Sequence, residues 1–342
     1  MHVNLHPRLL LLLVALSACT RTPADDASMD ALQDVNTVGP DERAGEDASM
    51  EAALPDAARP DAAVPDAAVP AASACARPDE CAWIEDYQRD IVGRLAGERP
   101  IAPGVTLASR SSVAQRTAAR TYLRDELTAR GVPSTFHDYA TGQNVVARLE
   151  ATTGAGTPRL IVGAHYDSVT AGPGAADDAT GVAIVLVAAR YLSTLPRRDH
   201  PIDFVLFDQE EIGLVGSRAY VEMLRTQSAA VDSVHAFDML SFDGDGDRAV
   251  ELWSPSPGLE ALYRTHGTLR GIPVFAVTFT SSDHQSFLTR GFAAVGVGEE
   301  FVGGDHTPHY HRATDTFDRV DFTYLALMTR LALDVLADRV TD

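Results

Sequence analysis

The chain has 342 residues, of which 28 are basic and 48 acidic, so its formal net charge is −20. It contains no lysine, which excludes a phosphate-binding loop with a Walker lysine, a Schiff-base amine and a serine–lysine dyad. Because the excess negative charge repels phosphate backbones, we expect no nucleic-acid partner. Hydrophobic residues make up 45% of the chain, which is ordinary for a protein with a sizeable core.

Residues 1–18 predict a signal peptide. The apolar run over residues 9–16 is shorter than the roughly 20 residues that span a bilayer. The run ends in the letters LSAC, which resemble a bacterial lipobox, so we expect Cys19 to be acylated and to be the chain's one contact with a membrane. Thr20 after the cysteine favours an exported lipoprotein of the outer membrane, by analogy with lipoprotein sorting. An ordinary signal peptide with a chance cysteine stays open as the alternative.

Composition divides the rest of the chain into two parts. Residues 19–74 are rich in alanine, proline and acids and contain no aromatic residue, so they cannot bury enough apolar surface to become ordered. We expect a disordered tether there and one globular domain over residues 75–342. Once Cys19 is assigned to lipid, Cys75 and Cys81 remain, and in an exported chain they most simply form a local disulfide.

The domain alternates between two kinds of segment. Runs of branched apolar residues that begin at residues 144, 159, 202, 233, 249, 273 and 293 predict strands. Helical patterns cover residues 112–130, 181–195, 214–227, 258–270, 283–290 and 322–339. This alternation predicts an α/β fold, a three-layer sandwich with a central, mostly parallel mixed sheet flanked by helices. Such sheets place their chemistry at the carboxyl ends of their strands.

Residues of metal-binding types follow these predicted strands. They are His165, Asp167, Asp177, Asp178, Glu210, Glu211, Asp238, His306, His309 and His311. Zinc takes histidine nitrogen and carboxylate oxygen as ligands, and a catalytic zinc keeps one position open. Residues two apart on a strand share a face, so Asp167 can orient the imidazole of His165. Adjacent residues point to opposite sides, so we expect Glu210 and Glu211 to face different points and to divide into a base and a ligand.

The order and spacing of these residues resemble those of the cocatalytic zinc aminopeptidases, a family that includes secreted bacterial leucyl aminopeptidases, over most of residues 143–340. The segments GAHYDS and PGAADDATG are similar to the family's HxD strand end and [D]D[ND]A[ST]G loop, with Ala176 in place of the first acid. FDQEEIGLVGSRAY is similar to F-x-x-E-E-x-G-L-x-G-S-x-x-Y and is the most specific match. FDML resembles the family's LDM, and YHRATDT resembles Y-H-T-x-x-D-T with Arg312 in place of threonine.

The resemblance implies a zinc-exopeptidase fold and a dizinc aminopeptidase that acts on peptides, with Glu210 as the general base. It implies one zinc on Asp177, Glu211 and His311 and the other on His165, Asp177 and Asp238. It favours His311 over His306 and His309, and the similarity of SSDHQSF to a further family segment places His284 beside the substrate or behind a ligand.

Two other functions and one further ion stay open. Glutaminyl cyclases resemble the same fold and use one zinc on an Asp, a Glu and a His, although DDATG and EEIGLVGS look more like the peptidases. A non-catalytic binding module on this fold is the second alternative. Asp243, Asp245 and Asp247 resemble the start of a calcium loop, but Ser254 stands where such a loop has its bidentate Glu. Calcium therefore stays open as an additional ion.

Overall fold

The computed structural model describes residues 74–75, 81–154 and 157–342. The predicted signal peptide, Cys19 and almost all of the predicted tether lie outside these residues. No helix among the described residues combines the length and the apolar character that crossing a bilayer requires. The helices are α1 (Trp83–Leu95), α2 (Val113–Ala129), α3 (Thr180–Ser193), α4 (Val215–Thr226), α5 (Pro257–Arg270), α6 (His284–Leu288) and α7 (Phe322–Val340), with short helical turns η1 (Ala175–Ala179) and η2 (Phe317–Arg319).

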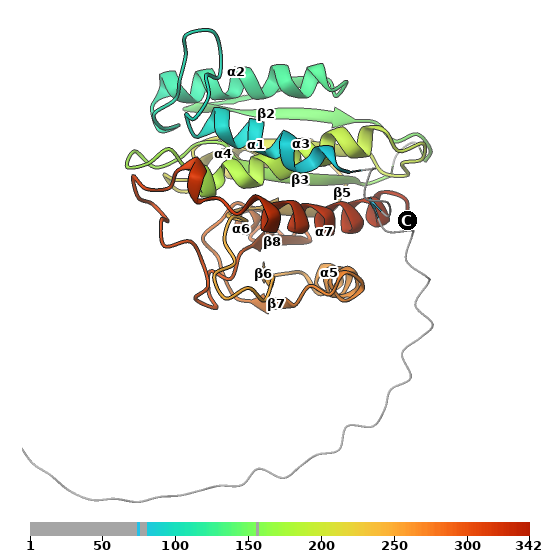
Figure 1. The fold of residues 1–342 in the computed structure, drawn as a ribbon. Helices are drawn as coiled ribbons and strands as arrows, with labels where there is room; N and C mark the ends of the chain where they lie inside the picture. Colours follow the sequence, from blue (N-terminus) through green and yellow to red (C-terminus); the bar gives the residue numbers. More distant parts are fainter. Residues whose placement is uncertain (1–73, 76–80, 155–156) are drawn as a thin grey trace, which may run out of the picture. The chain divides into compact units, whose positions relative to one another are not determined.

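One mixed sheet lies at the centre of the domain (Figure 1). Its strands, among the described residues, are β1 (Ser134–Tyr139), β2 (Gly142–Leu149), β3 (Arg159–His165), β4 (Ile202–Phe207), β5 (Val231–Phe237), β6 (Val250–Trp253), β7 (Val274–Val277) and β8 (Ala294–Gly298). Their order across the sheet is β1-β2-β4-β3-β5-β8-β6-β7. The four inner strands β4, β3, β5 and β8 run parallel to one another. The pairs β1–β2, β2–β4 and β6–β8 are antiparallel, and β6 pairs in parallel with β7. The carboxyl ends of the four inner strands therefore meet at one edge of the sheet.

Helices cover both faces of the sheet, as the prediction of a three-layer α/β sandwich requires. On one face α3 packs against β3, β4 and β5 and also contacts α1, α2 and α7, while α5 contacts β7, β8 and α7. On the other face α4 contacts β1 and β2, and α6 contacts β5 and β8 (Figure 1). The inner strands explain this arrangement because consecutive residues enter different cores: Leu160 and Val162 face the α3 side, whereas Ile161 packs with α4 and α6.

Local sequence signals set several helix ends. Ser112 accepts a hydrogen bond from the backbone N–H of Gln115, whose side chain returns the contact, so α2 begins with a capping box. Asp321 caps α7 by accepting from the N–H groups of Thr323 and Tyr324.

Two elements differ from the sequence expectation. Helix α1 and strand β1 fall in segments for which no element was predicted. The β1 sequence is largely polar because β1 is an edge strand, half buried and paired on one side, so it lacks the apolar run typical of the inner strands. Near the start of α1, the structure joins Cys75 and Cys81 in a disulfide, with their Cα atoms 5.5 Å apart.

Candidate metal centre

The candidate residues converge at the edge where the inner strands end. His165 is the last residue of β3, and Asp238 directly follows β5. Glu210 and Glu211 lie in the turn after β4, and His311 lies in the long segment after β8. Parallel pairing of these four strands brings together residues that are up to 146 positions apart in the sequence. All five side chains face one cavity.

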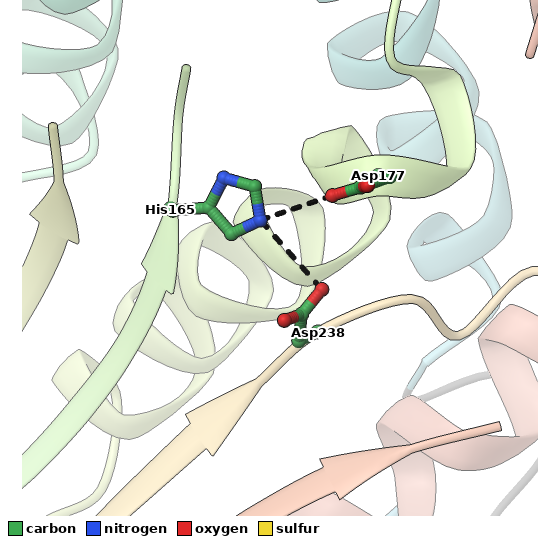
Figure 2. Close-up of side chains that lie close together, drawn as sticks. All are labelled: His165, Asp177 and Asp238. Carbon is green, nitrogen blue, oxygen red and sulfur yellow. Dashed lines mark ion pairs between the residues drawn. The ribbon is translucent and has the colours of Figure 1, made fainter. Parts of the chain in front are cut away.

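The first group consists of His165, Asp177 and Asp238 (Figure 2). Nε2 of His165 lies 3.0 Å from Oδ1 of Asp177 and 3.7 Å from Oδ1 of Asp238. One potential ligand atom of each residue lies within 4.8 Å of the other two. All three residues are buried, with at most 7% of their surface exposed. A histidine nitrogen and two carboxylate oxygens in this arrangement are suited to a divalent cation such as zinc.

The second group consists of Asp177, Glu211 and His311, so Asp177 belongs to both groups. Nε2 of His311 lies 3.2 Å from Oδ2 of Asp177 and 3.0 Å from Oε2 of Glu211. The other two candidate histidines lie elsewhere: His306 packs against the ring of Phe301, and His309 hydrogen-bonds with Thr314. The structure therefore places His311 beside the shared carboxylate.

Asp167 connects three parts of the site. Its Oδ1 lies 3.4 Å from Nδ1 of His165 and accepts the backbone N–H of Glu210 at 3.0 Å, and its Oδ2 accepts the N–H of Glu211 at 3.3 Å. Glu210 and Glu211 line the same cavity, but only Glu211 belongs to one of the two candidate ligand groups, so their division into a base and a ligand stays a prediction. Strand alternation does not apply to them because β4 ends at Phe207 and Asp167 holds the turn that follows.

The loop that carries Asp177 is held by two further acids. Asp315 accepts the backbone N–H groups of Ala176 at 2.7 Å and of Asp177 at 3.2 Å. Asp178 is fully buried and does not line the cavity; its carboxylate accepts backbone N–H groups from His165 and from residues 181 and 239. Asp178 thus ties the loop to the ends of β3 and β5.

Sequence reasoning missed two of these supporting residues. In the sequence, Asp315 was used only as the motif position that identifies His311, and it was given no role of its own. Ser282 was not considered, although it donates a hydrogen bond to Oδ2 of Asp238 at 2.8 Å. Both lie inside matched motifs, YHRATDT and SSDHQSF, so the motif was the available signal. His284, from the same SSDHQSF segment, is fully buried and absent from the cavity lining; its Nε2 hydrogen-bonds with the carbonyl oxygen of Phe279 at 2.9 Å.

The cavity has a volume of about 350 Å³ and has one apolar side. Trp253, Phe279, Phe301 and Tyr310 form this side, which we call the aromatic wall. The ring centres of Trp253 and Phe279 are 4.6 Å apart, and Phe301 lies 5.3 Å from Phe279 and 5.1 Å from Tyr310. A Cβ atom at Gly298 would lie 2.1 Å from the indole, so the wall requires glycine there.

Four non-glycine residues at the site have left-handed backbone conformations. They are Gln209, Leu214, Met239 and His311, with φ between 55° and 62°. This conformation costs each residue roughly 1 kcal/mol or more. Surrounding contacts hold these positions, and each of the four is a cavity residue or the neighbour of one.

Charge is concentrated in the cavity. Burial lowers the pKa of His165, but the charge of Glu210 and contacts with Asp167, Asp177 and Asp238 outweigh it, and the pKa lies well above its usual value. Burial raises the pKa of Glu211 to about 8, with a contribution from Asp177. Burial and nearby carboxylates also hold the pKa of Glu210 well above its usual range. These acids are therefore crowded and partly desolvated, which a bound cation would relieve.

Unpaired buried atoms support the fit of cations to the two groups. Oδ1 of Asp238 and Oε1 of Glu211 are buried and have no hydrogen-bond partner among the described residues. Both are carboxylate oxygens, the ligand type that a divalent cation prefers together with imidazole nitrogen. The donor set therefore fits a pair of divalent cations, and the individual ligand roles stay predictions.

The acidic loop considered for calcium lies apart from this cavity. Asp243, Asp245 and Asp247 approach one another, and Asp245 also lies near Glu300 and Asp305. Asp243, Asp245 and Asp247 accept backbone N–H groups of their own loop, and Asp305, from a distant segment, accepts the N–H groups of residues 244 and 245. Calcium binding there stays a prediction.

Comparison with known proteins agrees with this geometry. Residues 144–336 match the model of peptidase family M28. The chain is 31% identical over 216 residues to the probable lipoprotein aminopeptidase LpqL of Mycobacterium tuberculosis, covering 54% of this chain and 43% of LpqL. It is 29% identical over 191 residues to the aminopeptidase YwaD of Bacillus subtilis, covering 53% of this chain and 41% of YwaD. The chain thus spans less than half the length of these curated relatives.

Solved structures share the fold. LapB of Legionella pneumophila superposes with a TM-score of 0.65 at 20% identity, covering 76% of this chain and 72% of LapB. A glutaminyl cyclase of Porphyromonas gingivalis superposes with a TM-score of 0.60 at 19% identity, covering 75% of this chain and 98% of the cyclase. At these identities the structures show the architecture alone, whereas the family model covers more than half of the sequence. The chain belongs to peptidase family M28.

Proposed function

We propose that this protein is a dizinc aminopeptidase, which removes the N-terminal residue of peptides. The observation that carries the proposal is the pair of three-residue groups that share Asp177 and lie in one cavity with Glu210. Relatives named as aminopeptidases support the reaction class, and a similar structure from Bacillus subtilis, 25% identical with a TM-score of 0.55, is described as a zinc aminopeptidase.

Within this proposal each zinc has three protein ligands. One site is His165, Asp177 and Asp238, and the other is Asp177, Glu211 and His311. Two divalent cations held by these residues would polarise the scissile carbonyl and lower the pKa of water at the site. Asp167 holds His165 in orientation, as outer partners of metal-binding histidines do.

Glu210 carries the proton transfers. Its raised pKa suits a group that must first accept a proton from the attacking water and then give that proton to the departing amine. Asp167 fixes the backbone N–H of Glu210 and thereby its place in the turn. Tyr310 lines the same cavity, and its ring stacks on that of His311 with the ring centres 3.8 Å apart, so this ring packs directly against a candidate ligand.

The cavity's apolar side indicates the class of N-terminal residue. The aromatic wall and the acidic residues line the same cavity, so a substrate can place its apolar side chain against the rings and its positive amino group beside the carboxylates. We therefore propose large apolar residues such as leucine as preferred N-terminal residues. Apolar surface of the substrate that is buried against the rings gains about 25 cal/mol of binding free energy per Å². A large apolar side chain is therefore favoured over a small or a charged one.

Export and anchoring also belong to the proposal. We infer an exported bacterial lipoprotein of the outer membrane with a signal peptide over residues 1–18, an acylated Cys19, a tether over residues 19–74 and a catalytic domain over residues 75–342. The lipobox-like sequence supports the anchor, and so does the name of LpqL, a probable lipoprotein aminopeptidase. Mass spectrometry of the membrane fraction tests this: acylation of Cys19 supports it, and an unmodified mature chain beginning elsewhere contradicts it.

The decisive experiment separates the base from the ligands. The purified protein is loaded with zinc, its zinc content is measured, and release of leucine from a leucine anilide is followed in the wild type, Glu210→Gln and Glu211→Gln. We expect Glu210→Gln to retain two zinc ions while kcat falls by about 10² to 10⁴, and Glu211→Gln to lose one zinc. Full activity of Glu210→Gln would refute its role as base.

Zinc content, release of leucine and an added assay with a peptide that begins with glutamine discriminate the alternative functions. One zinc per chain with cyclisation of an N-terminal glutamine, and no release of leucine, would identify a glutaminyl cyclase. Absence of zinc binding and of turnover would identify a binding module on this fold.

A further inference from the structure

A second cavity adjoins the metal centre. It has a volume of about 340 Å³ and lies between helix α4 and the segment over residues 285–290. Leu214 and Arg218 line both this cavity and the one that holds the candidate ligands. The two cavities therefore meet at the first turn of α4, and a peptide that starts in the first can continue into the second.

Arg218 differs from the other arginine of the second cavity. Arg290 pairs with Glu222 at 2.8 Å, and Glu222 also pairs with Arg225 at 3.1 Å. Arg218 is exposed and forms no ion pair with any acid among the described residues. It is thus the arginine at the junction of the cavities whose charge is available to a ligand.

The position of Arg218 in α4 adds to its attraction for an anion. Leu214 caps the helix and Arg218 lies in its first turn, so both are at the positive end of the helix dipole. A guanidinium also offers paired N–H donors that match the two oxygens of a carboxylate. The N-terminal end of α4 and the guanidinium of Arg218 therefore both favour an anion, such as a carboxylate, at this position.

The neighbouring charges explain why a cation matters there. The first cavity contains the carboxylates of Asp177, Glu210, Glu211 and Asp238. Two bound zinc ions would offset the charge of these four carboxylates, but the chain as a whole keeps an acidic excess, with a formal net charge of −20. A substrate with a carboxylate close to its cleaved bond therefore gains from a cation that faces it. Because the two cavities share Leu214 and Arg218, and an extended peptide advances about 3.3 to 3.6 Å per residue, we place the first residues after that bond in the second cavity.

We propose that Arg218 binds a carboxylate on the leaving part of the substrate, so that the enzyme prefers peptides with a carboxylate within two residues after the cleaved bond. The carboxylate is the free terminus of a di- or tripeptide or the side chain of an acidic residue. This specificity rests on the proposed aminopeptidase function and extends it to the substrate's far side.

The test compares paired substrates that differ in one charge. KM and kcat are measured for leucyl-alanine and its amide, and for leucyl-glutamate amide and leucyl-glutamine amide. We expect the wild type to show a KM about fivefold lower for the charged member, the size of a partly exposed charged contact. Arg218→Gln should bring this ratio close to one, with the change in KM rather than in kcat.

A matched control lies on the same helix. Arg225 is an exposed arginine of α4 that lines neither cavity and pairs with Glu222, so Arg225→Gln should keep the wild-type ratio. The first pair of substrates reports on a terminal carboxylate and the second on an acidic side chain. An unchanged charged-to-uncharged ratio in Arg218→Gln for both pairs would overturn the proposal.

Binding measurements separate this proposal from the proposed function. Calorimetry with Glu210→Gln records the affinity of leucyl-alanine and its amide without turnover, and the double variant Glu210→Gln with Arg218→Gln records the contribution of Arg218. A preference for the free acid that disappears in the double variant supports the role of Arg218 even if the wild type cleaves neither peptide, a result that would refute the aminopeptidase alone. Equal affinities for both peptides would refute the role of Arg218.

Discussion

Substitution of Asp167 by asparagine tests how the site is held in place. The carboxylate accepts two backbone N–H groups, those of Glu210 and Glu211, and faces Nδ1 of His165. An asparagine retains one oxygen and presents an NH₂ group where the second oxygen was, so at least one N–H loses its acceptor. Because Asp167 is 3% exposed, water does not replace the lost contact.

The expected magnitudes follow from these contacts. Loss of one buried hydrogen bond to a charged acceptor costs about 1.5 to 3 kcal/mol. The free energy of unfolding of the metal-free protein should fall by about this amount, so the protein should unfold at a lower denaturant concentration. His165 loses its charged partner, which should weaken zinc at the first group by about 10- to 100-fold.

Two assays measure these effects in Asp167→Asn. Denaturant unfolding without metal gives the change in stability, and competition with a chromophoric chelator gives the zinc affinity. The same substitution at Asp86, an exposed acid in the first turn of α1, should leave zinc affinity unchanged and lower stability by less than about 1 kcal/mol. Wild-type zinc affinity and stability in Asp167→Asn would refute the conclusion that this carboxylate organises the site.

Three further outcomes are expected. His311→Ala should lower zinc content from two ions to one, whereas His306→Ala should leave it unchanged; the reverse, by metal analysis, would show that the wrong histidine was chosen. Burial lowers the pKa of His235 to about 4, whereas in the unfolded chain this histidine has its ordinary pKa of about 6.5. As the pH falls from 6.5 towards 4, the unfolded chain therefore binds a proton that the folded protein does not, and the folded protein loses stability. This loss is about 2 kcal/mol at pH 5, and denaturant unfolding of His235→Gln should show a correspondingly smaller difference between pH 7.5 and pH 5. Gly298→Ala should cost about 1 to 3 kcal/mol by pushing a methyl group into the aromatic wall, whereas Gly258→Ala, where a Cβ meets no atom within 4 Å, should not destabilise; equal melting temperatures would refute this.

The inner sheet and its polar edge were predictable because their signals are local. Strands such as β3 and β4 are apolar on both faces, and the residues that follow them belong to motifs with fixed spacing. The prediction of an α/β sandwich is confirmed by the observed layers and by the similar structures. Edge strand β1 lacks the apolar pattern because it is only partly buried and pairs with a neighbouring strand on one side only.

Contacts made by residues distant in sequence could not be predicted. Arg110 is fully buried and donates hydrogen bonds to the carbonyl oxygens of Tyr166 at 2.6 Å and Gly174 at 2.9 Å. Arginine is normally exposed, and no pattern in the chain connects Arg110 to a loop more than 50 residues away. The shared cavity of Glu210 and Glu211 was missed for a similar reason, because the place where a strand gives way to a turn depends on the acceptor that Asp167 supplies.

The double membership of Asp177 has a thermodynamic consequence. One oxygen lies 3.0 Å from His165 and the other 3.2 Å from His311, so a cation at either group orients the carboxylate that the other group also needs. Occupancy of the two sites is therefore linked, and linkage is reciprocal: whatever factor the first ion imposes on the affinity of the second, the second imposes on the first. A titration with zinc should accordingly yield two dissociation constants that belong to the pair, and a substitution at Asp177 should alter both of them together.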